Sequence, residues 1–111
     1  MATGLGDGAR LRGLDFISRK LTDITLPSGG TGTLGRLEIR LGECRYPIDA
    51  PASDAFAWLE IRDRRSGREL FRGWMIASSP ALMALDNPRY DVWLLGCTGL
   101  PAEADSAPAS E

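Results

Sequence analysis

Alternating apolar and polar residues predict β-strands along most of the chain. The clearest strand lies in LGRLEIRL, where Leu37, Ile39 and Leu41 share one face and the charged residues between them share the other. The same pattern predicts further strands at residues 11–18, 21–27, 55–63, 69–77 and 90–97. The last two of these are apolar on both faces, which is typical of strands covered on two sides.

A short helix is predicted between the last two strands, in SSPALMALDNP at residues 78–88. A serine and a proline suit its first positions, and Asp-Asn-Pro would stop it after about two turns. In such a helix Leu82 and Leu85 would face the sheet and Met83 would point to solvent, where a methionine suits partner binding. In the alternative interpretation the helix plugs one end of a barrel, with all three side chains buried.

Together these elements predict an all-β fold, a small sandwich or barrel of about six strands with one short helix before the last strand. Residues 1–10 carry no signal-peptide pattern and are expected to be a flexible lead. Residues 11–99 are expected to form a single β domain. Residues 100–111, rich in alanine, proline, serine and acids, are expected to be a disordered acidic tail.

The segment GTGTLG, Gly30 to Gly35, matches the G-x-G-x-x-G spacing of dinucleotide-binding loops. In such a loop the glycines follow a strand and open a helix, whose amides hold the pyrophosphate. Here the last glycine runs into the predicted strand that contains Leu37. The segment is therefore interpreted as a hairpin connection, and no nucleotide is expected to bind it.

Composition narrows the possible functions. The 111 residues include 13 basic and 15 acidic residues, a net charge of −2, so the chain has no basic excess for binding nucleic acid. Histidine is absent, which removes Ser-His and Cys-His activation and the commonest metal ligand. We expect no catalytic residue, no metal and no cofactor. No apolar run approaches the roughly 20 residues that a membrane-spanning helix needs.

The two cysteines, Cys44 and Cys97, each end a predicted strand. In an exported protein such a pair usually forms a bridge that ties two ends of a small β domain together, whereas cytosolic cysteines usually stay as buried thiols. Their wide separation gives neither a zinc-site spacing nor a paired-thiol redox motif. A structural disulfide is the favoured interpretation.

The stretch RDRRSGR contains the only concentration of basic residues. It could contact lipid headgroups or an acidic partner, or it could be a hairpin tip whose charges keep a sheet edge soluble. The basic side chains concerned are Arg62, Arg64, Arg65 and Arg68.

The three tryptophans are divided between core and surface. Trp58 shares a strand face with Glu60 and is therefore a candidate for an exposed contact. Trp74 and Trp93 lie in the most apolar strands and are assigned to the core.

Enzymatic interpretations rest on few residues. Two pairs of carboxylates and one Ser–Lys dyad are candidate catalytic groups, although none of them lies in a recognisable motif. The simpler interpretation is that the aspartates cap turns. The residues concerned are Asp15 with Asp23, Asp86 with Asp91, and Ser18 with Lys20.

The block FRGWMIASSPALMALDNPRYDVWLLGC at residues 71–97, with GRLEIRLGEC and LRGLDFIS before it, resembles a family of short exported alphaproteobacterial proteins, the domain of unknown function 2155 family. The resemblance covers about residues 11–97 and lies in the ordered elements G-W-M, S-S-P-A-L and Y-D-V-W. It implies a periplasmic address and an oxidised Cys44–Cys97 pair. It also suggests an inner-membrane partner, with respiratory complex I as a candidate, and implies no particular activity or ligand.

The expected function is a non-enzymatic periplasmic module that binds another envelope or inner-membrane protein. The alternative is a small-ligand-binding or hydrolytic β-barrel that uses carboxylates and an exposed Trp58. A deep polar pocket holding aspartate side chains would favour the alternative.

Overall fold

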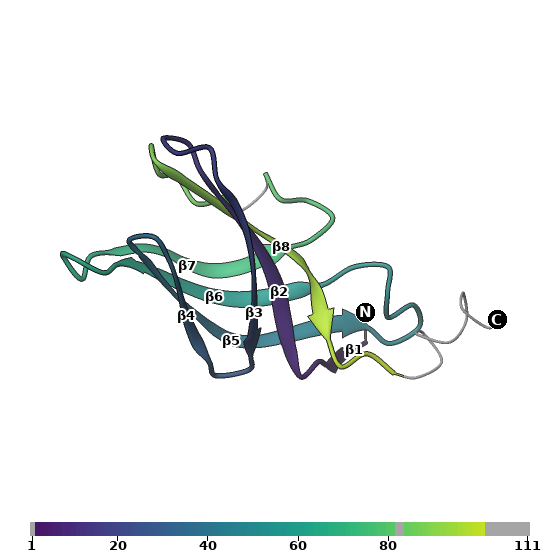
Figure 1. Ribbon diagram of the computed structural model, residues 1–111. Coiled ribbons are helices and arrows are strands. Elements are labelled where there is room, and N and C mark those ends of the chain that lie inside the picture. Colours follow the sequence, from purple (N-terminus) through teal and green to yellow (C-terminus); the bar gives the residue numbers. More distant parts are fainter. Residues whose placement is uncertain (1, 82–83, 102–111) are drawn as a thin grey trace.

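The computed structural model describes residues 2–81 and 84–101, which form two antiparallel β-sheets packed face to face (Figure 1). The strands are β1 (Thr3–Leu5), β2 (Gly8–Asp15), β3 (Leu21–Pro27), β4 (Thr31–Leu34), β5 (Leu37–Pro47), β6 (Phe56–Asp63), β7 (Glu69–Ile76) and β8 (Tyr90–Thr98). The predicted all-β class is confirmed, and the arrangement is that of a sandwich. The described residues form eight strands where about six were expected, because β1 and β4 lie in segments interpreted as a flexible lead and a hairpin connection.

Strand β5 organises the larger, five-stranded sheet, in which the order is β1-β5-β6-β7. Because β5 is 11 residues long, one of its edges pairs with two short strands, β4 at its start and β1 at its end. The smaller sheet has the order β3-β2-β8. Its strands cross over the larger sheet in Figure 1, and every pairing in both sheets is antiparallel.

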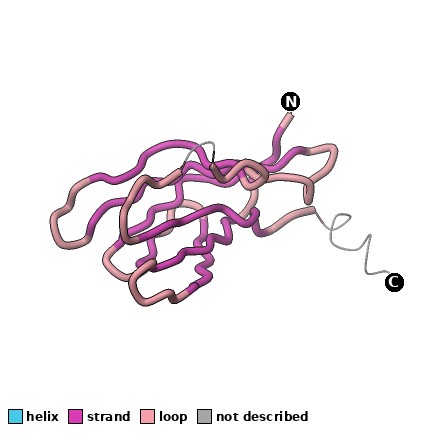
Figure 2. Tube along the Cα trace, turned by 90° about the horizontal axis from the view of Figure 1, so that it is seen from above, coloured by secondary structure: helices cyan, strands magenta, loops and turns pink. Residues whose placement is uncertain are grey.

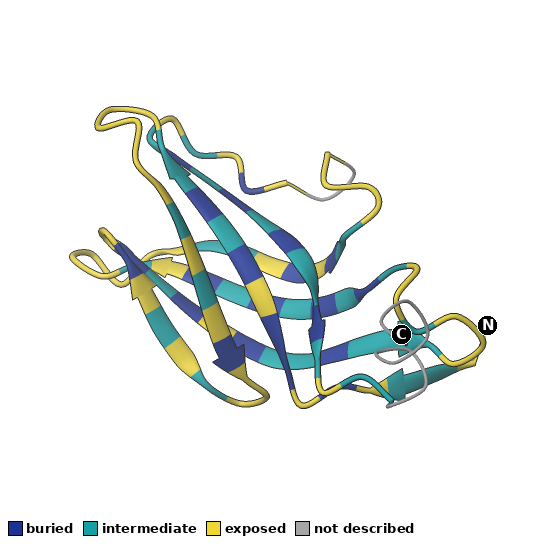
Figure 3. Ribbon diagram, turned by 45° about the vertical axis from the view of Figure 1, so that its right-hand side comes forward, coloured by how far each residue is buried: buried dark blue, intermediate teal, exposed yellow. Residues whose placement is uncertain are grey.

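The core lies between the two sheets and is built from alternate residues of each strand. Figure 3 shows the resulting bands of buried and more exposed residues along the strands. Leu37, Ile39 and Leu41 are at most 1% exposed, so the face predicted for this strand is confirmed. On β6 the inward positions are Ala57, Leu59 and Ile61, which are also at most 1% exposed. No charged or polar residue is buried among the described residues, so the interior is a purely apolar packing layer.

The predicted short helix is wrong. Strands, turns and loops make up the described residues, and Figure 2 shows no helical segment among them. The segment 78–88 leaves β7 in a turn instead, where Asp54 accepts hydrogen bonds from the amide (3.0 Å) and the hydroxyl (2.8 Å) of Ser78. Side-chain bonds of this kind compete with helix formation, and a helix of about two turns gains few backbone bonds for the cost of its first turn.

The rest of this segment leads back into the core. Leu85 is 5% exposed, as expected of a residue that packs against the sheet. The side-chain oxygen of Asn87 then accepts hydrogen bonds from the amides of Arg89 (2.9 Å) and Tyr90 (3.0 Å), which sets the start of β8. Leu82 and Met83 lie outside the described residues, so the expectation that Met83 is a contact residue stays a prediction.

The expected flexible lead at residues 1–10 is also wrong for most of its length. Thr3–Leu5 pairs with β5, and β2 begins already at Gly8. Between these strands the amide of Gly6 donates to the carbonyl of Cys44 (2.8 Å) and that of Asp7 to the carbonyl of Thr98 (2.9 Å). Backbone hydrogen bonds to distant strands hold this segment in place, and such bonds need no particular side chain. The glycine-rich sequence therefore gave no sign that the segment is ordered. Of the predicted tail at residues 100–111, Leu100 is partly buried and packs against the core, and residues 102–111 lie outside the described residues.

The glycine-rich segment Gly30 to Gly35 contains a strand rather than a single loop. Strand β4 occupies residues 31–34, and a tight turn at Gly35 leads directly into β5. Gly35 has a φ of +58°, a left-handed conformation that glycine adopts without steric cost. A strand therefore follows the last glycine, where a phosphate-binding loop would need a helix.

Replacing Gly35 with alanine is expected to lower the free energy of unfolding by about 2–3 kcal/mol. Its φ is positive, and a Cβ added there would lie 2.5 Å from the hydroxyl of Tyr90. Gly67→Ala is the matched control, because Gly67 has a φ of +76° but open space around it. Urea unfolding monitored by tryptophan fluorescence would measure both variants. Equal losses of stability would contradict a role for the contact with Tyr90.

Candidate functional site

The outer face of the five-stranded sheet brings together two tryptophans and a row of charged side chains. The register places Trp58 of β6 beside Trp74 of β7, and Glu60 beside Arg72. On the other side of β6, Arg40 of β5 is the partner of Glu60. Alternation along each strand turns these side chains away from the core.

The two tryptophan rings contact each other on this face. Their centroids are 5.7 Å apart and their planes meet at 74°, an edge-to-face contact. Trp58 is half-buried and lies over Gly42 of β5, where an added Cβ would approach its ring to 2.8 Å. Trp74 is 39% exposed. The glycine therefore makes room for the inner ring, and the inner ring supports the outer one.

The prediction that Trp74 belongs to the core is wrong, and Trp93 is only half-buried. The inward positions of β7 are Gly73 and Met75, with Met75 2% exposed. On β8 Trp93 lies on the outer face, opposite Arg12 of β2. Both strands are apolar on both faces in sequence, so periodicity could not indicate which face turns inward.

Glu60 is the centre of the polar part of this face. Its carboxylate accepts a hydrogen bond from the indole nitrogen of Trp58 (3.0 Å) and forms ion pairs with Arg40 (3.5 Å) and Arg72 (3.7 Å). The hydrogen bond from Trp58 and then the nearby arginines hold the pKa of Glu60 below its ordinary value. Glu60 is therefore ionised at neutral pH and fixes the positions of its three neighbours.

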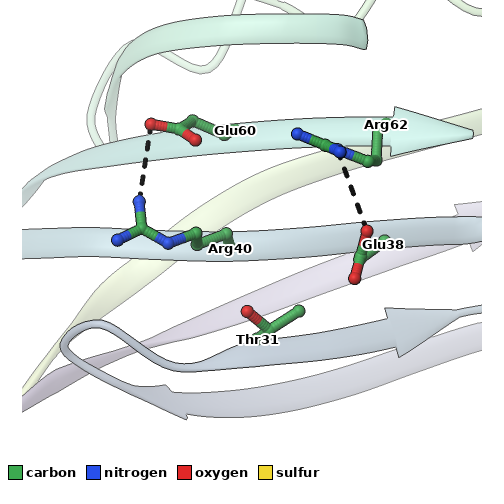
Figure 4. Close-up of a pocket in the computed structure, with 5 residues that line it drawn as sticks. All are labelled: Thr31, Glu38, Arg40, Glu60 and Arg62. Carbon is green, nitrogen blue, oxygen red and sulfur yellow. Dashed lines mark ion pairs between the residues drawn. The ribbon is translucent and has the colours of Figure 1, made fainter. Parts of the chain in front are cut away.

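A hollow of about 230 Å³ lies next to these residues (Figure 4). It is lined by Thr31, Glu38, Arg40, Glu60 and Arg62, which come from β4, β5 and β6. The close-up shows two arginine–glutamate pairs side by side, Arg40 with Glu60 and Arg62 with Glu38, the latter at 3.8 Å. Because Glu60 is held ionised by its hydrogen bond and by two guanidinium groups, it is not suited to act as a general acid.

The four arginines predicted as contacts do not form one cluster. Arg62 lies on the outer sheet face and pairs with Glu38. The other three lie in the turn between β6 and β7, where Arg64 donates from its guanidinium to the carbonyl of Gly35 (3.0 Å). Arg65 and Arg68 are exposed and make no side-chain ion pair within the described residues.

The proposed carboxylate pair Asp15 and Asp23 is not brought together as a pair. Asp15 accepts from Arg89 (3.1 Å) and Asp23 from Arg12 (2.7 Å). In each case the hydrogen bond from the arginine is the main cause that lowers the pKa of the aspartate. Each carboxylate therefore has its own guanidinium partner and stays ionised at neutral pH.

The remaining enzymatic candidates show no paired chemistry either. The Ser18 hydroxyl accepts a hydrogen bond from the backbone amide of Lys20 (3.2 Å), so it stabilises a turn. Asp91 lines a hollow with Trp93, whereas Asp86 is an exposed residue of the preceding loop. Within residues 2–81 and 84–101, no three acidic or cysteine side chains are grouped in a way that could hold a metal ion.

The predicted cysteine pair is present and joins the two sheets. Cys44 of β5 and Cys97 of β8 have sulfurs 2.11 Å apart and Cα atoms 5.7 Å apart. Bulges near both residues produce this arrangement, since the β5–β6 register shifts between Leu41 and Cys44 and the β2–β8 register shifts between Leu94 and Gly96. After each shift the cysteine lies on the inner face, which brings the two cysteines together.

Sequence reasoning missed one exposed apolar group. Phe16, Ile17 and Leu21 at the tip of the β2–β3 hairpin are 48%, 72% and 54% exposed. Phe16 falls within the strand predicted at residues 11–18, but β2 ends at Asp15. A signal was present, because an apolar pair directly before Ser-Arg-Lys is unusual for a hairpin tip, where polar turn residues dominate.

Comparison with known proteins gives one family. A family model described as an uncharacterized protein conserved in bacteria (DUF2155) matches residues 9–97. No curated protein and no solved structure gives a match. Among the described residues no helix is long and apolar enough to cross a membrane. The family model spans both sheets, from the start of β2 to Cys97, and the chain therefore belongs to the DUF2155 family.

Proposed function

We propose that this protein is a non-enzymatic interaction module of the cell envelope, and that it binds a partner protein through the outer face of its five-stranded sheet. The observation that carries the proposal is the solvent-facing Trp74, which is supported by Trp58 and bordered by the Arg40–Glu60–Arg72 network. We call this set of five residues the tryptophan face.

The chemistry of the tryptophan face matches that of a protein contact. Tryptophan and arginine are the residue types most enriched among those that dominate binding energy at interfaces. A tryptophan fixed by an edge-to-face contact loses little conformational entropy when a partner covers it. The paired charges around it can form the polar rim that surrounds such an anchor.

The alternative function, a ligand-binding or hydrolytic barrel, has less support. It would need a deep polar pocket with free carboxylates, whereas the glutamates of the hollow on this face already pair with arginines. Asp15 lines a second hollow with Ser18 and Lys20, but its carboxylate pairs with Arg89. Asp54 lines a third, where it accepts a hydrogen bond from Ser78. The space between the sheets is filled by apolar side chains. These features favour binding to a surface over chemistry within a cavity.

A periplasmic location is part of the proposal. The bridge between Cys44 and Cys97 supports it, because disulfides form and persist in oxidising compartments and are rare in the cytosol. Proteins of the inner membrane are the first partners to test, with respiratory complex I as one candidate.

Replacement of Trp74 by alanine is expected to weaken partner binding by at least tenfold, in the range of about 2 kcal/mol seen for interface anchors. The measurement is quantitative capture of solubilised inner-membrane proteins on the immobilised protein. Trp93→Ala is the matched control, since Trp93 lies on the outer face of the other sheet. A photo-crosslinker placed at position 62, an exposed residue of the same sheet face outside the tryptophan face, should link to the same partner that capture recovers.

Two results would count against the proposal. One is a folded Trp74→Ala variant that captures its partner as well as the native protein does. The other is turnover of a small substrate that is lost when Glu60 is replaced by glutamine, which would support the alternative function instead.

A further inference from the structure

One end of the sandwich gathers three hairpin turns and the start of β8. Hydrogen bonds connect them: the amide of Phe16 donates to the carbonyl of Arg89 (2.8 Å), and that of Arg64 to the carbonyl of Arg36 (2.7 Å). The amide of Arg36 also donates to the hydroxyl of Tyr90 (3.1 Å). We call residues 15–21, 35–36, 63–68 and 89 the hairpin end. Figure 1 shows these turns on the side of the molecule away from β1.

The hairpin end carries a concentrated apolar group. Six large apolar residues are exposed among those described, and Phe16, Ile17 and Leu21 are three of them. They lie within one hairpin tip, and Ile17 is the most exposed of all six at 72%. Grouped apolar side chains on a projecting tip indicate a surface that something else covers.

The tip is held in one conformation rather than left loose. The carboxylate of Asp15 accepts hydrogen bonds from the amides of Ile17 (2.9 Å) and Ser18 (3.3 Å), and the carbonyl of Asp15 accepts from the amide of Arg19 (2.7 Å). Arg89 fixes the same carboxylate through an ion pair at 3.1 Å. The loop therefore presents Ile17 outward in a fixed position, so little order has to be gained on binding.

The hairpin end is also strongly basic. Its acidic residues, Asp15 and Asp63, are paired with Arg89 and Arg36 respectively. The basic residues left without an ion pair within the described part of the chain are Arg19, Lys20, Arg64, Arg65 and Arg68. Seven bases against two acids give this end a charge of +5, although the whole chain carries −2.

We propose that the hairpin end docks on the surface of a bilayer that contains anionic phospholipids. Ile17 and Phe16 would enter the boundary between headgroups and acyl chains, while the unpaired bases lie over the phosphates. A bilayer fits this end better than a protein partner does, because it receives a projecting apolar tip without a matching pocket. The combination of apolar insertion and basic residues provides the two signals that stable surface attachment needs.

This docking would leave the tryptophan face free. That face lies along the middle of β6 and β7, and the hairpin end is at the turn that joins these strands. A protein attached by its hairpin end would therefore present the tryptophan face sideways to proteins of the same membrane. The two sites are separate, so each can be tested without the other.

The experiment measures binding to vesicles by sedimentation. Vesicles of phosphatidylglycerol mixed with phosphatidylcholine should bind the native protein, vesicles of phosphatidylcholine alone should bind it at least tenfold more weakly, and added salt should release it. Ile17→Asp should weaken binding by about tenfold or more, and Arg65→Glu, which reverses one exposed base of the hairpin end, should do the same.

Matched variants control for the chemistry of each change. Ile48→Asp makes the same change at a residue that is 51% exposed but lies in the loop after β5, outside the hairpin end. Arg10→Glu reverses the charge of an exposed arginine that also has no ion pair within the described residues. Both should bind the anionic vesicles as the native protein does, and so should Trp74→Ala, which separates this proposal from the proposed function.

The proposal fails if the native protein does not sediment with anionic vesicles, or if folded Ile17→Asp binds them as well as Ile48→Asp does. Soluble glycerol phosphate provides a further check on the source of the anion. If millimolar glycerol phosphate abolishes vesicle binding, the hairpin end is a site for a free phosphate group and the bilayer proposal is wrong. If vesicle binding persists, the bilayer itself is the ligand.

Discussion

Removal of the Cys44–Cys97 disulfide is expected to lower the free energy of unfolding by about 4 kcal/mol. The bridge closes a loop with a sequence separation of 53 residues, and in the chain-entropy view it restricts the unfolded chain by an amount that grows with loop length. It also connects β5 of one sheet to β8 of the other, while each sheet is held internally by backbone pairing. A loss of this size is a large share of the stability of a small domain.

Thermal unfolding of the double variant Cys44→Ala, Cys97→Ala would show the effect as a fall in Tm of roughly 15–30 °C. The cysteines are 0% and 6% exposed, so alanine also removes some packing. Native protein reduced with dithiothreitol is the control that removes the bond alone. If the reduced protein keeps its Tm within a few degrees, the disulfide makes little contribution to stability.

Replacing Leu59 with alanine is expected to lower the free energy of unfolding by about 2–5 kcal/mol. Leu59 is 0% exposed in the middle of β6, between Leu41 of β5 and Gly73 of β7. Gly73 has no side chain that could move into the space, so the cavity would stay largely open. Urea unfolding would measure the loss through the midpoint at constant slope.

Leu21→Ala is the control for this prediction because it makes the same chemical change at a residue that is 54% exposed. Its effect should stay within about 0.5 kcal/mol. Equal effects at the two positions would mean that the space between the sheets is not the packed core that the burial of Leu59 indicates.

Part of the site could be foreseen from sequence and part could not. Trp58 was expected at the surface next to Glu60, and the structure places its indole against that carboxylate. Trp74 was expected in the core because its strand is apolar on both faces, and the register with β6 turned it outward. The same local pattern fits either orientation, so only the pairing of strands can choose between them.

Two secondary-structure assignments, a helix near residue 79 and a flexible lead at residues 1–10, were wrong because they rested on local sequence alone. A serine, a proline and a following apolar run favoured a helix near residue 79, but Asp54, far away in the chain, bonds to Ser78 and directs the turn. Strand β1 forms on the edge of β5 although its sequence is glycine-rich. In both cases the residue or strand that determines the conformation is distant in sequence, whereas secondary-structure propensity depends only on the local sequence.

The sequence by itself determined the all-β class, because strand patterns recur along most of the chain and period-2 alternation, as at Leu37, Ile39 and Leu41, can bury one face only as a strand. It also indicated the pairing of Cys44 with Cys97. Only the tertiary structure decided how the cysteines meet, because the bulges that turn both inward arise from mismatched strand pairings. It alone also placed the β2–β3 tip and the basic β6–β7 turn at the same end of the sandwich, since this arrangement depends on hydrogen bonds between segments that are distant in the chain.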